Sequence, residues 1–173
     1  MTMIDYSAYE DYFRDLATRY QKIGHSPTSN HFAVMDIDDI LSAMRSDLNF
    51  ETPSLILENP EGKFSYHNSA LRDENFGAFL ILQQCINRGD TQQKREVMDH
   101  TKKVGAQVIS RMHIDKQTRF KGTKDAPRFV QMFRLEQVRY FKAGPLFSNC
   151  YGWRFEFNIG MEGAMYYDSE DWD

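Results

Sequence analysis

The chain has 173 residues, of which 41% are hydrophobic and 14% aromatic, and its formal net charge is −4. This composition is typical of a globular protein of about one domain and excludes a largely disordered chain. The acidic balance argues against non-specific binding of nucleic acid by the whole surface, and no apolar run reaches the ~18 residues of a transmembrane helix.

Residues 1–6 contain neither the basic nor the apolar region of a secretory signal, so we expect no signal peptide. The two cysteines, Cys85 and Cys150, lack the spacing of a metal or redox motif. A disulfide between them remains open, but the missing export signal favours reduced thiols.

The first element is expected to be a helix with Asp5 as its N-cap and Gly24 at its end. One apolar stripe supports this helix, with residues spaced three and four apart: Tyr6, Tyr9, Phe13, Leu16, Ala17 and Tyr20. Residues 25–35 are predicted to be irregular. Asp36 then caps a second, shorter helix, whose apolar residues Ile37, Ile40, Leu41 and Met44 share a face.

From residue 53 the apolar residues alternate with a period of two. Residues 55–58 predict a short strand, 59–62 a turn and 63–67 a half-buried partner strand. A loop follows, and the continuous apolar run at 76–82 predicts a central strand covered on both faces. Short links between these strands favour hairpins.

The longest helix is predicted at 91–115, where Asp90 and Gln93 resemble a capping box. Val104, Gly105 and Val108 share one face of this helix and are expected to pack closely onto the sheet. Residues 116–127 form a polar, basic segment that predicts an exposed loop.

Residues 129–141 predict a long strand with a bulge near Glu136–Gln137, followed by a turn at 143–145. The clearest strand pattern comes last, because its large apolar side chains alternate with polar ones. We expect these apolar residues to point into the core against Val104 and Val108: Trp153, Phe155, Phe157 and Ile159.

Together these elements predict the α+β class: a single domain with a mostly antiparallel (or mixed) sheet of about five strands. A long helix packs against the sheet and two helices precede it. Within this domain, 1–173, we distinguish the N-terminal helix and loop (1–35), the α+β core (36–160) and an acidic, aromatic tail (161–173).

Motifs for catalysis or cofactor binding are not found. The five histidines lack zinc-finger or HExxH spacing, and Asp36–Asp39 lacks the glycine and distal glutamate of a calcium loop. No phosphate-binding glycine loop leads into a helix, and no GxSxG elbow occurs. We therefore expect no catalytic residue, no metal, no cofactor and no enzymatic activity.

A restriction-like nuclease shares part of this element order and is the enzyme alternative. Such enzymes need an acid on the second strand and an acid-x-Lys motif on the third, to hold Mg²⁺ and polarise a water. Here the second strand carries no acid, and neither Asp73 nor Glu74 has a lysine two residues later. Glu61 and Lys63 have the spacing, but they fall in and beside a predicted turn.

Charge is divided along the chain. Ten basic residues and four acidic ones lie between Lys94 and Arg128, whereas the segment from Glu162 onward carries five carboxylates and no base. This division predicts head-to-tail association through a candidate assembly interface: Lys116, Arg119, Lys121, Lys124, Arg128, Tyr166, Tyr167 and Trp172. The alternatives are a solvated helix face with a frayed terminus, and a basic patch that steers a DNA backbone.

The element order, with a leading helix, a hairpin, a long central strand, a helix and a closing strand pair, resembles the tail terminator and tail completion proteins of tailed phages. The segment 149–159 is similar in style to the last strand of small neck proteins in phages of Bacteroides-type hosts. The resemblance spans residues 36–159. The second helix and the acidic tail depart from it.

This resemblance implies a virion structural protein, a head–tail connector or tail-end subunit that is made in the host cytoplasm and forms a homo-oligomeric ring. Its expected partners are neighbouring neck or tail proteins and, in the ring lumen, non-specific contact with DNA, but no membrane. A small intracellular adaptor domain that binds one protein partner is the alternative from another class.

Overall fold

The computed structural model describes residues 5–42, 47–67, 70–87, 89–123, 126–159 and 161–164. Its elements follow in the order α1 (Tyr6–Arg19), β1 (Phe32–Met35), α2 (Ile37–Ser42), β2 (Ser54–Glu58), β3 (Glu61–His67), β4 (Ala70–Gln84), α3 (Thr91–Gln117), α4 (Arg128–Met132), a 3-10 turn (Leu135–Gln137), β5 (Arg139–Leu146), β6 (Cys150–Asn158) and β7 (Met161–Ala164). The expected α+β class is confirmed, with seven strands in one mixed sheet instead of about five.

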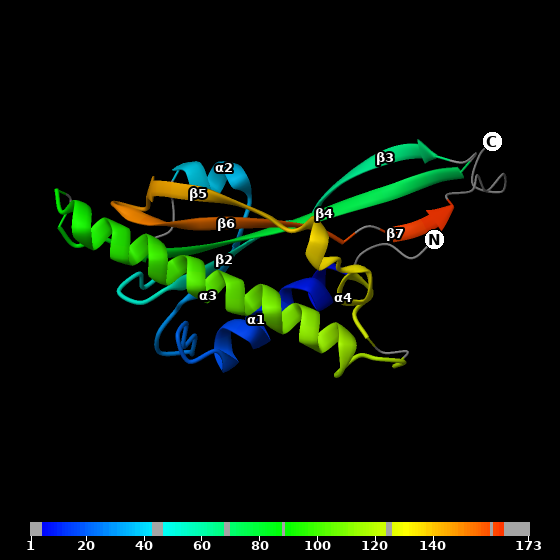
Figure 1. Ribbon diagram of the computed structural model, residues 1–173, viewed down its shortest axis with the longest axis horizontal. Helices are drawn as coiled ribbons and strands as arrows, with labels where there is room; N and C mark the ends of the chain where they lie inside the picture. Colours follow the sequence, from blue (N-terminus) through cyan, green and yellow to red (C-terminus); the bar gives the residue numbers. More distant parts are fainter. Residues whose placement is uncertain are drawn as a thin grey trace.

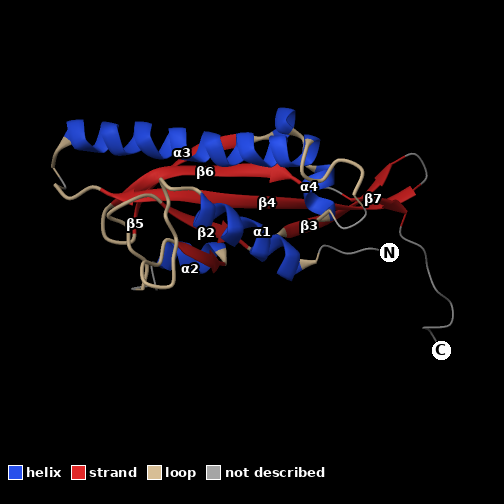
Figure 2. Ribbon diagram, turned by 90° about the horizontal axis from the view of Figure 1, so that it is seen from below, coloured by secondary structure: helices blue, strands red, loops and turns tan. Residues whose placement is uncertain are grey.

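Strand β4 organises the sheet. The body follows the order β1-β2-β4-β6-β5, in which only β1 and β2 are parallel. The second half of β4 lies between β2 and β6, and its first half lies between β3 and β7. As Figure 2 shows, β4 therefore runs from the body into a β-ribbon that extends beyond the helices.

The predicted hairpin between residues 55–58 and 63–67 is wrong. Strands β2 and β3 do not pair with each other, because both pair with the same side of β4. Pro60 lies between them and has no backbone N–H, so it cannot donate to a ladder. β4 can supply both partners because it begins at Ala70, where a loop was expected.

A parallel strand also lies within the segment predicted to be irregular. Residues 32–35 form β1, whose Phe32 lies opposite Leu55 of β2. Three of its four residues are buried. The short helix α2 follows β1, close to its predicted position.

The predicted strand at 129–141 is wrong over its first ten residues, 129–138. Residues 128–132 form helix α4, residues 135–137 form a 3-10 turn, and β5 begins only at Arg139. Phe129, Val130 and Phe133 are all buried, and their spacing of one and four fits a single helical turn. Because Phe129 and Phe133 also share a phase in a strand, the pattern fits both structures.

The expected bulge and turn after this segment are also displaced. The 3-10 turn occupies the position of the bulge, and residues 143–145 belong to β5, where the Gly144–Pro145 peptide bond is cis. The chain reverses instead at Phe147, Ser148 and Asn149, which all have positive φ.

Helices α1 and α3 cover one face of the body and enclose the main core (Figure 1). Phe155, Phe157 and Ile159 are buried there as expected, and Trp153 packs at the border of this core. Gly105 of α3 brings the helix against the sheet, because a Cβ at this position would overlap the Phe155 ring. The close packing predicted for this face of the helix is therefore confirmed.

The opposite face carries a smaller apolar cluster. Ile40 of α2 packs there with Met35, Leu80, Leu82 and Phe147. The short α2 is the one helix that contributes to this cluster among the described residues, so part of this face is left to the side chains of the strands themselves.

Both long helices begin at their predicted caps. The Asp5 carboxylate accepts from the Ala8 N–H, and the Asp90 carboxylate accepts from the N–H groups of Gln92 and Gln93. The Gln93 side chain accepts from the Asn87 N–H and does not return to Asp90, so the capping box is one-sided.

Candidate functional site

The β-arm, which we define as β3, residues 70–76 of β4, and β7, extends away from the helices at one end of the molecule (Figure 1). Phe64 and Tyr66 of β3 are 66% and 74% exposed. Phe64 lies opposite Asp73, which is in phase along β4 with the core residue Phe79. These rings therefore continue the face that α1 and α3 cover in the body, but none of the described helices covers them here.

The other face of the β-arm is polar and its groups are paired within the arm. Ser65 donates a 2.6 Å hydrogen bond to Glu74, and Lys63 lies 3.4 Å from the same carboxylate. The Lys63 ammonium also lies 5.5 Å from the centre of the Phe76 ring. Among the described side chains of the β-arm, the large apolar groups that are mostly exposed, Phe64 and Tyr66, thus lie on the aromatic face.

Strand β5 is an edge strand at the opposite side of the sheet. It pairs with β6, and within the described residues no strand pairs with its outer edge. Tyr140 and Phe141 are 50% and 48% exposed and point to opposite faces, because they are consecutive residues of one strand. An exposed edge with aromatic side chains is a template for pairing with another chain.

A groove separates the first turns of α3 from β5 and β6, and we call it the α3–β5 groove. It is lined by Lys94, Arg95 and Asp99 of α3, by Lys142 of β5, and by Tyr151 and Trp153 of β6. Three cations and one carboxylate therefore surround an aromatic floor. The first turns of α3, which line this groove, lie at the end of the molecule opposite the β-arm (Figure 1).

Lysines lie over the rings of this floor. The Lys94 ammonium is 4.3 Å from the centre of the Tyr151 ring. Further along α3, Lys102 lies 4.6 Å from the Tyr140 ring and 4.9 Å from the Trp153 ring. The Trp153 indole N–H donates to the Met98 carbonyl at 2.8 Å, which fixes the ring beneath the helix. These contacts preorganise a cationic, aromatic surface.

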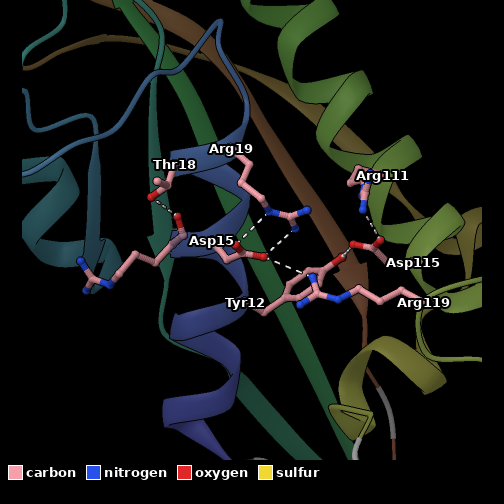
Figure 3. Close-up of polar contacts among 8 residues, drawn as sticks. Tyr12, Asp15, Thr18, Arg19, Arg111, Asp115 and Arg119 are labelled. Atoms are coloured by element: carbon pink, nitrogen blue, oxygen red, sulfur yellow. Dashed lines mark hydrogen bonds and ion pairs between the residues drawn. The ribbon is translucent and has the colours of Figure 1, made fainter. Parts of the chain in front are cut away.

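Helices α1 and α3 are joined by a buried polar contact, shown in Figure 3. The Tyr12 hydroxyl donates to Asp115 Oδ2 at 3.0 Å, and Arg111 Nη2 lies 2.9 Å from Asp115 Oδ1. Asp115 is fully buried. Burial, with the neighbouring Asp115 carboxylate, raises the pKa of the Tyr12 hydroxyl far above its ordinary value, so Tyr12 stays a donor.

A second, more exposed contact lies beside it. The Arg19 guanidinium donates to both carboxylate oxygens of Asp15, at 2.8 and 2.5 Å. Arg119 donates to the same carboxylate at 3.2 Å (Figure 3). All three side chains are more than a third exposed, so each pair contributes only ~0–1 kcal/mol. The arrangement ties the segment after α3 to α1.

The sequence-predicted interface residues fall in different places. The Lys116 ammonium donates to the Phe133 carbonyl at 2.7 Å, Arg119 contacts Asp15, and Lys121 is exposed. Lys124, the side chain of Arg128, Tyr166, Tyr167 and Trp172 lie outside the described residues. Two of the three described residues thus hold α3 to α4 and α1, and their role in assembly stays a prediction.

Both cysteines are buried, and they are not bonded to each other. Burial raises the pKa of the Cys150 thiol to about 12. Because the thiolate is the reactive form, this position is chemically inert in the folded protein. The Cys85 thiol lies 3.3 Å from the Gln93 side-chain oxygen, which also accepts from the Asn87 N–H.

The acids considered for a nuclease lie in the β-arm. Asp73 and Glu74 are consecutive residues of β4, and Glu74 is paired with Ser65 and Lys63. In the part of the chain that the structure describes, no three His, Cys, Asp or Glu side chains are grouped to hold a metal ion. None of the described helices has the length and apolar character needed to cross a membrane.

Sequence reasoning missed Asp115 and the α3–β5 groove. Asp115 follows Val108 and Met112 at helical spacing, so a carboxylate that continues a buried stripe was the available signal. The groove left no comparable signal. Its lysines and rings come from α3, β5 and β6, and the sequence does not say that the start of α3 lies over β6.

Comparison with models of protein families, with curated proteins and with solved structures finds no match to this chain.

Proposed function

We propose that this chain is a non-enzymatic structural subunit that assembles with copies of itself into a ring. The observation that carries the proposal is the pair of exposed aromatic surfaces, one on the β-arm and one on the edge of the body at β5. The β-arm presents Phe64 and Tyr66, and the β5 edge presents Tyr140 and Phe141. Contiguous exposed aromatic residues mark interaction surfaces, because their exposure opposes solubility.

Two different surfaces, one on the arm and one on the body, favour head-to-tail contact, in which the arm of one subunit meets the body of the next. Such contacts are heterologous, and they close into a ring when the rotation between subunits allows it. A β-arm built on the same strand as the body is suited to this role, because β4 passes without interruption from one into the other.

The resemblance in element order supports a particular setting for such a ring, the tail terminator, tail completion or neck position of a tailed phage. The virion location, the neighbouring neck or tail proteins and the contact with DNA in the ring lumen belong to this proposal. The leading helix, the long central strand, the long helix and the closing pair β5–β6 are the elements that support it.

The test is the mass of the purified full chain in solution, measured over a range of concentrations by sedimentation velocity and checked for rings by electron microscopy. A Phe64→Ser/Tyr66→Ser variant should assemble at least tenfold less readily. The matched control is Ile86→Ser/Ile114→Ser, which removes two exposed apolar side chains, 78% and 48% exposed, from other surfaces. It should assemble like the wild type.

Two results would contradict the proposal. In the first, the chain stays monomeric at all concentrations, both alone and mixed with neck or tail proteins, and it binds one unrelated protein. The chain would then be an adaptor. Cleavage of DNA with Mg²⁺ or Mn²⁺ that disappears in Asp73→Ala or Glu74→Ala would make it a nuclease.

A further inference from the structure

We infer that the α3–β5 groove of one subunit binds the acidic, aromatic segment 165–173 of a neighbouring copy. The inference rests on the proposed head-to-tail assembly and names the contact that joins successive subunits. Three observations carry it: the charge of the groove, the free edge of β5 beside it, and the distance between the groove and the end of β7.

Charge and chemistry match between the two surfaces. The groove holds Lys94, Arg95 and Lys142 around one carboxylate, Asp99. Among the described residues, neither Arg95 nor Lys142 forms an ion pair, so both remain available. The segment 165–173 reads Met-Tyr-Tyr-Asp-Ser-Glu-Asp-Trp-Asp, with four carboxylates and three large rings.

The free edge of β5 supplies a backbone partner. A peptide that adds as a further strand beside β5 gains main-chain hydrogen bonds, and its alternate side chains meet the two faces of the sheet. The face of the sheet on the α3 side presents Tyr140. Lys94 lies over the Tyr151 ring, and Lys102 lies over the rings of Tyr140 and Trp153. Rings and carboxylates in one segment fit this surface, because the rings stack while the carboxylates meet the ammonium groups.

The geometry of β4 places the far end of the groove, at Tyr151, beyond the reach of the segment from its own subunit. Ala164 of β7 lies opposite Arg72, and Tyr151 of the groove lies opposite Gln83. Residues 72 and 83 are ~36 Å apart along an extended strand. Nine fully extended residues span at most ~32 Å, so the segment 165–173 falls short of Tyr151 in its own subunit, whereas Trp153, opposite Ile81 and ~30 Å away, lies at the limit of its reach. Figure 1 shows β7 and the start of α3 at opposite ends of the molecule.

A mixing experiment tests the inference on full chains. The groove variant is Lys94→Glu/Lys142→Glu, and the tail variant is Tyr167→Ala/Trp172→Ala. Each should lose self-association at least tenfold while keeping the wild-type circular dichroism and melting temperature. Mixed together, they should form a one-to-one dimer that grows no further, because only one intact groove and one intact tail remain. Lys22→Glu/Lys103→Glu is the control with the same charge change on exposed residues outside the groove, and it should assemble normally.

Other results separate the inference from the proposed function. If the groove variant assembles like the wild type while Lys121→Glu does not, the acceptor is the end of α3 and the inference is wrong, although the ring proposal stands. If the mixture yields no dimer, the tail does not act between copies, and the inference is again wrong.

A labelled synthetic peptide with the sequence of residues 165–173 provides the second measurement. It should bind the tail variant and lose at least tenfold affinity for the groove variant. Such binding, in a wild-type chain that forms only open rows of subunits and no closed ring, would keep the inference and overturn the ring. If the peptide fails to bind while a single-stranded oligonucleotide binds with strong salt dependence, the groove is a nucleic-acid surface and the inference is overturned.

Discussion

Gly105 of α3 lies directly against the ring of Phe155 of β6, with no space between them for a methyl group. The helix therefore packs on the sheet at a distance that only glycine allows at this position. In a free helix, alanine would be favoured over glycine by ~1 kcal/mol. Here the overlap with a buried ring reverses that preference.

Gly105→Ala should lower the free energy of unfolding by ~1–3 kcal/mol, because the added methyl group overpacks the core. Urea unfolding of the purified chain measures the effect. The double variant Gly105→Ala/Phe155→Leu should lose less than the two single variants added together, since the smaller side chain leaves room for the methyl group. A single variant that is more stable than the wild type would show that the sheet and helix are not in close contact here.

Phe155→Ala should cost ~3–5 kcal/mol, because it empties the centre of the main core beside Phe79, whose ring centre is 5.1 Å away. The control is Phe141→Ala, in the neighbouring strand but 48% exposed, which should cost less than ~1 kcal/mol. Thermal unfolding followed by circular dichroism separates the two. Equal melting temperatures for both variants would contradict the assignment of Phe155 to the core.

Tyr12→Phe should cost ~1–3 kcal/mol, because it leaves Asp115 Oδ2 buried without its hydroxyl donor. The apolar ring stays in place, so the loss reports on the hydrogen bond and not on packing. Tyr6→Phe, at a position 61% exposed on the same helix, should stay within ~0.5 kcal/mol of the wild type in the same urea titration. A neutral Tyr12→Phe would mean that water replaces the hydroxyl.

Stability should fall as the pH drops below ~6.5, in part because of His25. Burial, together with Arg14 and His31, lowers the pKa of its imidazole, and Nδ1 accepts the His31 N–H at 3.3 Å. The unfolded chain then binds a proton at a higher pH than the folded one, so acid favours unfolding in this window. His25→Gln removes that titration, and its melting temperature should change less than that of the wild type between pH 7.5 and pH 5.5.

The control for this experiment is His113→Gln, which leaves His25 in place and should keep the wild-type dependence on pH. An identical drop in melting temperature for wild type and His25→Gln would assign the effect to other groups.

The elements with a strong and unambiguous period could be predicted from the sequence. Helix α3 and strand β6 are both found where they were expected, because each carries many apolar residues of one period and a cap or turn at its start. Strand β1 has only four residues, too few for a period, and its partner lies some twenty residues away. Its position depends on tertiary pairing.

The segment 129–141 shows a different kind of failure. Phe129 and Phe133 are four residues apart, which suits both a helix turn and one face of a strand. Pro127, the N-cap residue immediately before α4, is a sign of a helix start that the spacing of the apolar residues does not contain. The β-arm and the α3–β5 groove were beyond prediction for a related reason, since both depend on which strands lie side by side along β4.

The long-range pairing of β4 has a consequence during synthesis. Its apolar second half is completed at Gln84, but the partner β6 begins only at Cys150. A ribosome adds ~5–20 residues per second, so the nascent strand waits roughly 3–13 s for that partner. During this interval β2 can cover one edge of β4 while the other stays open, and α3, made in between, is the element available to shield its core-facing side. The order of the elements along the chain thus limits how long an aggregation-prone strand is exposed before the sheet closes.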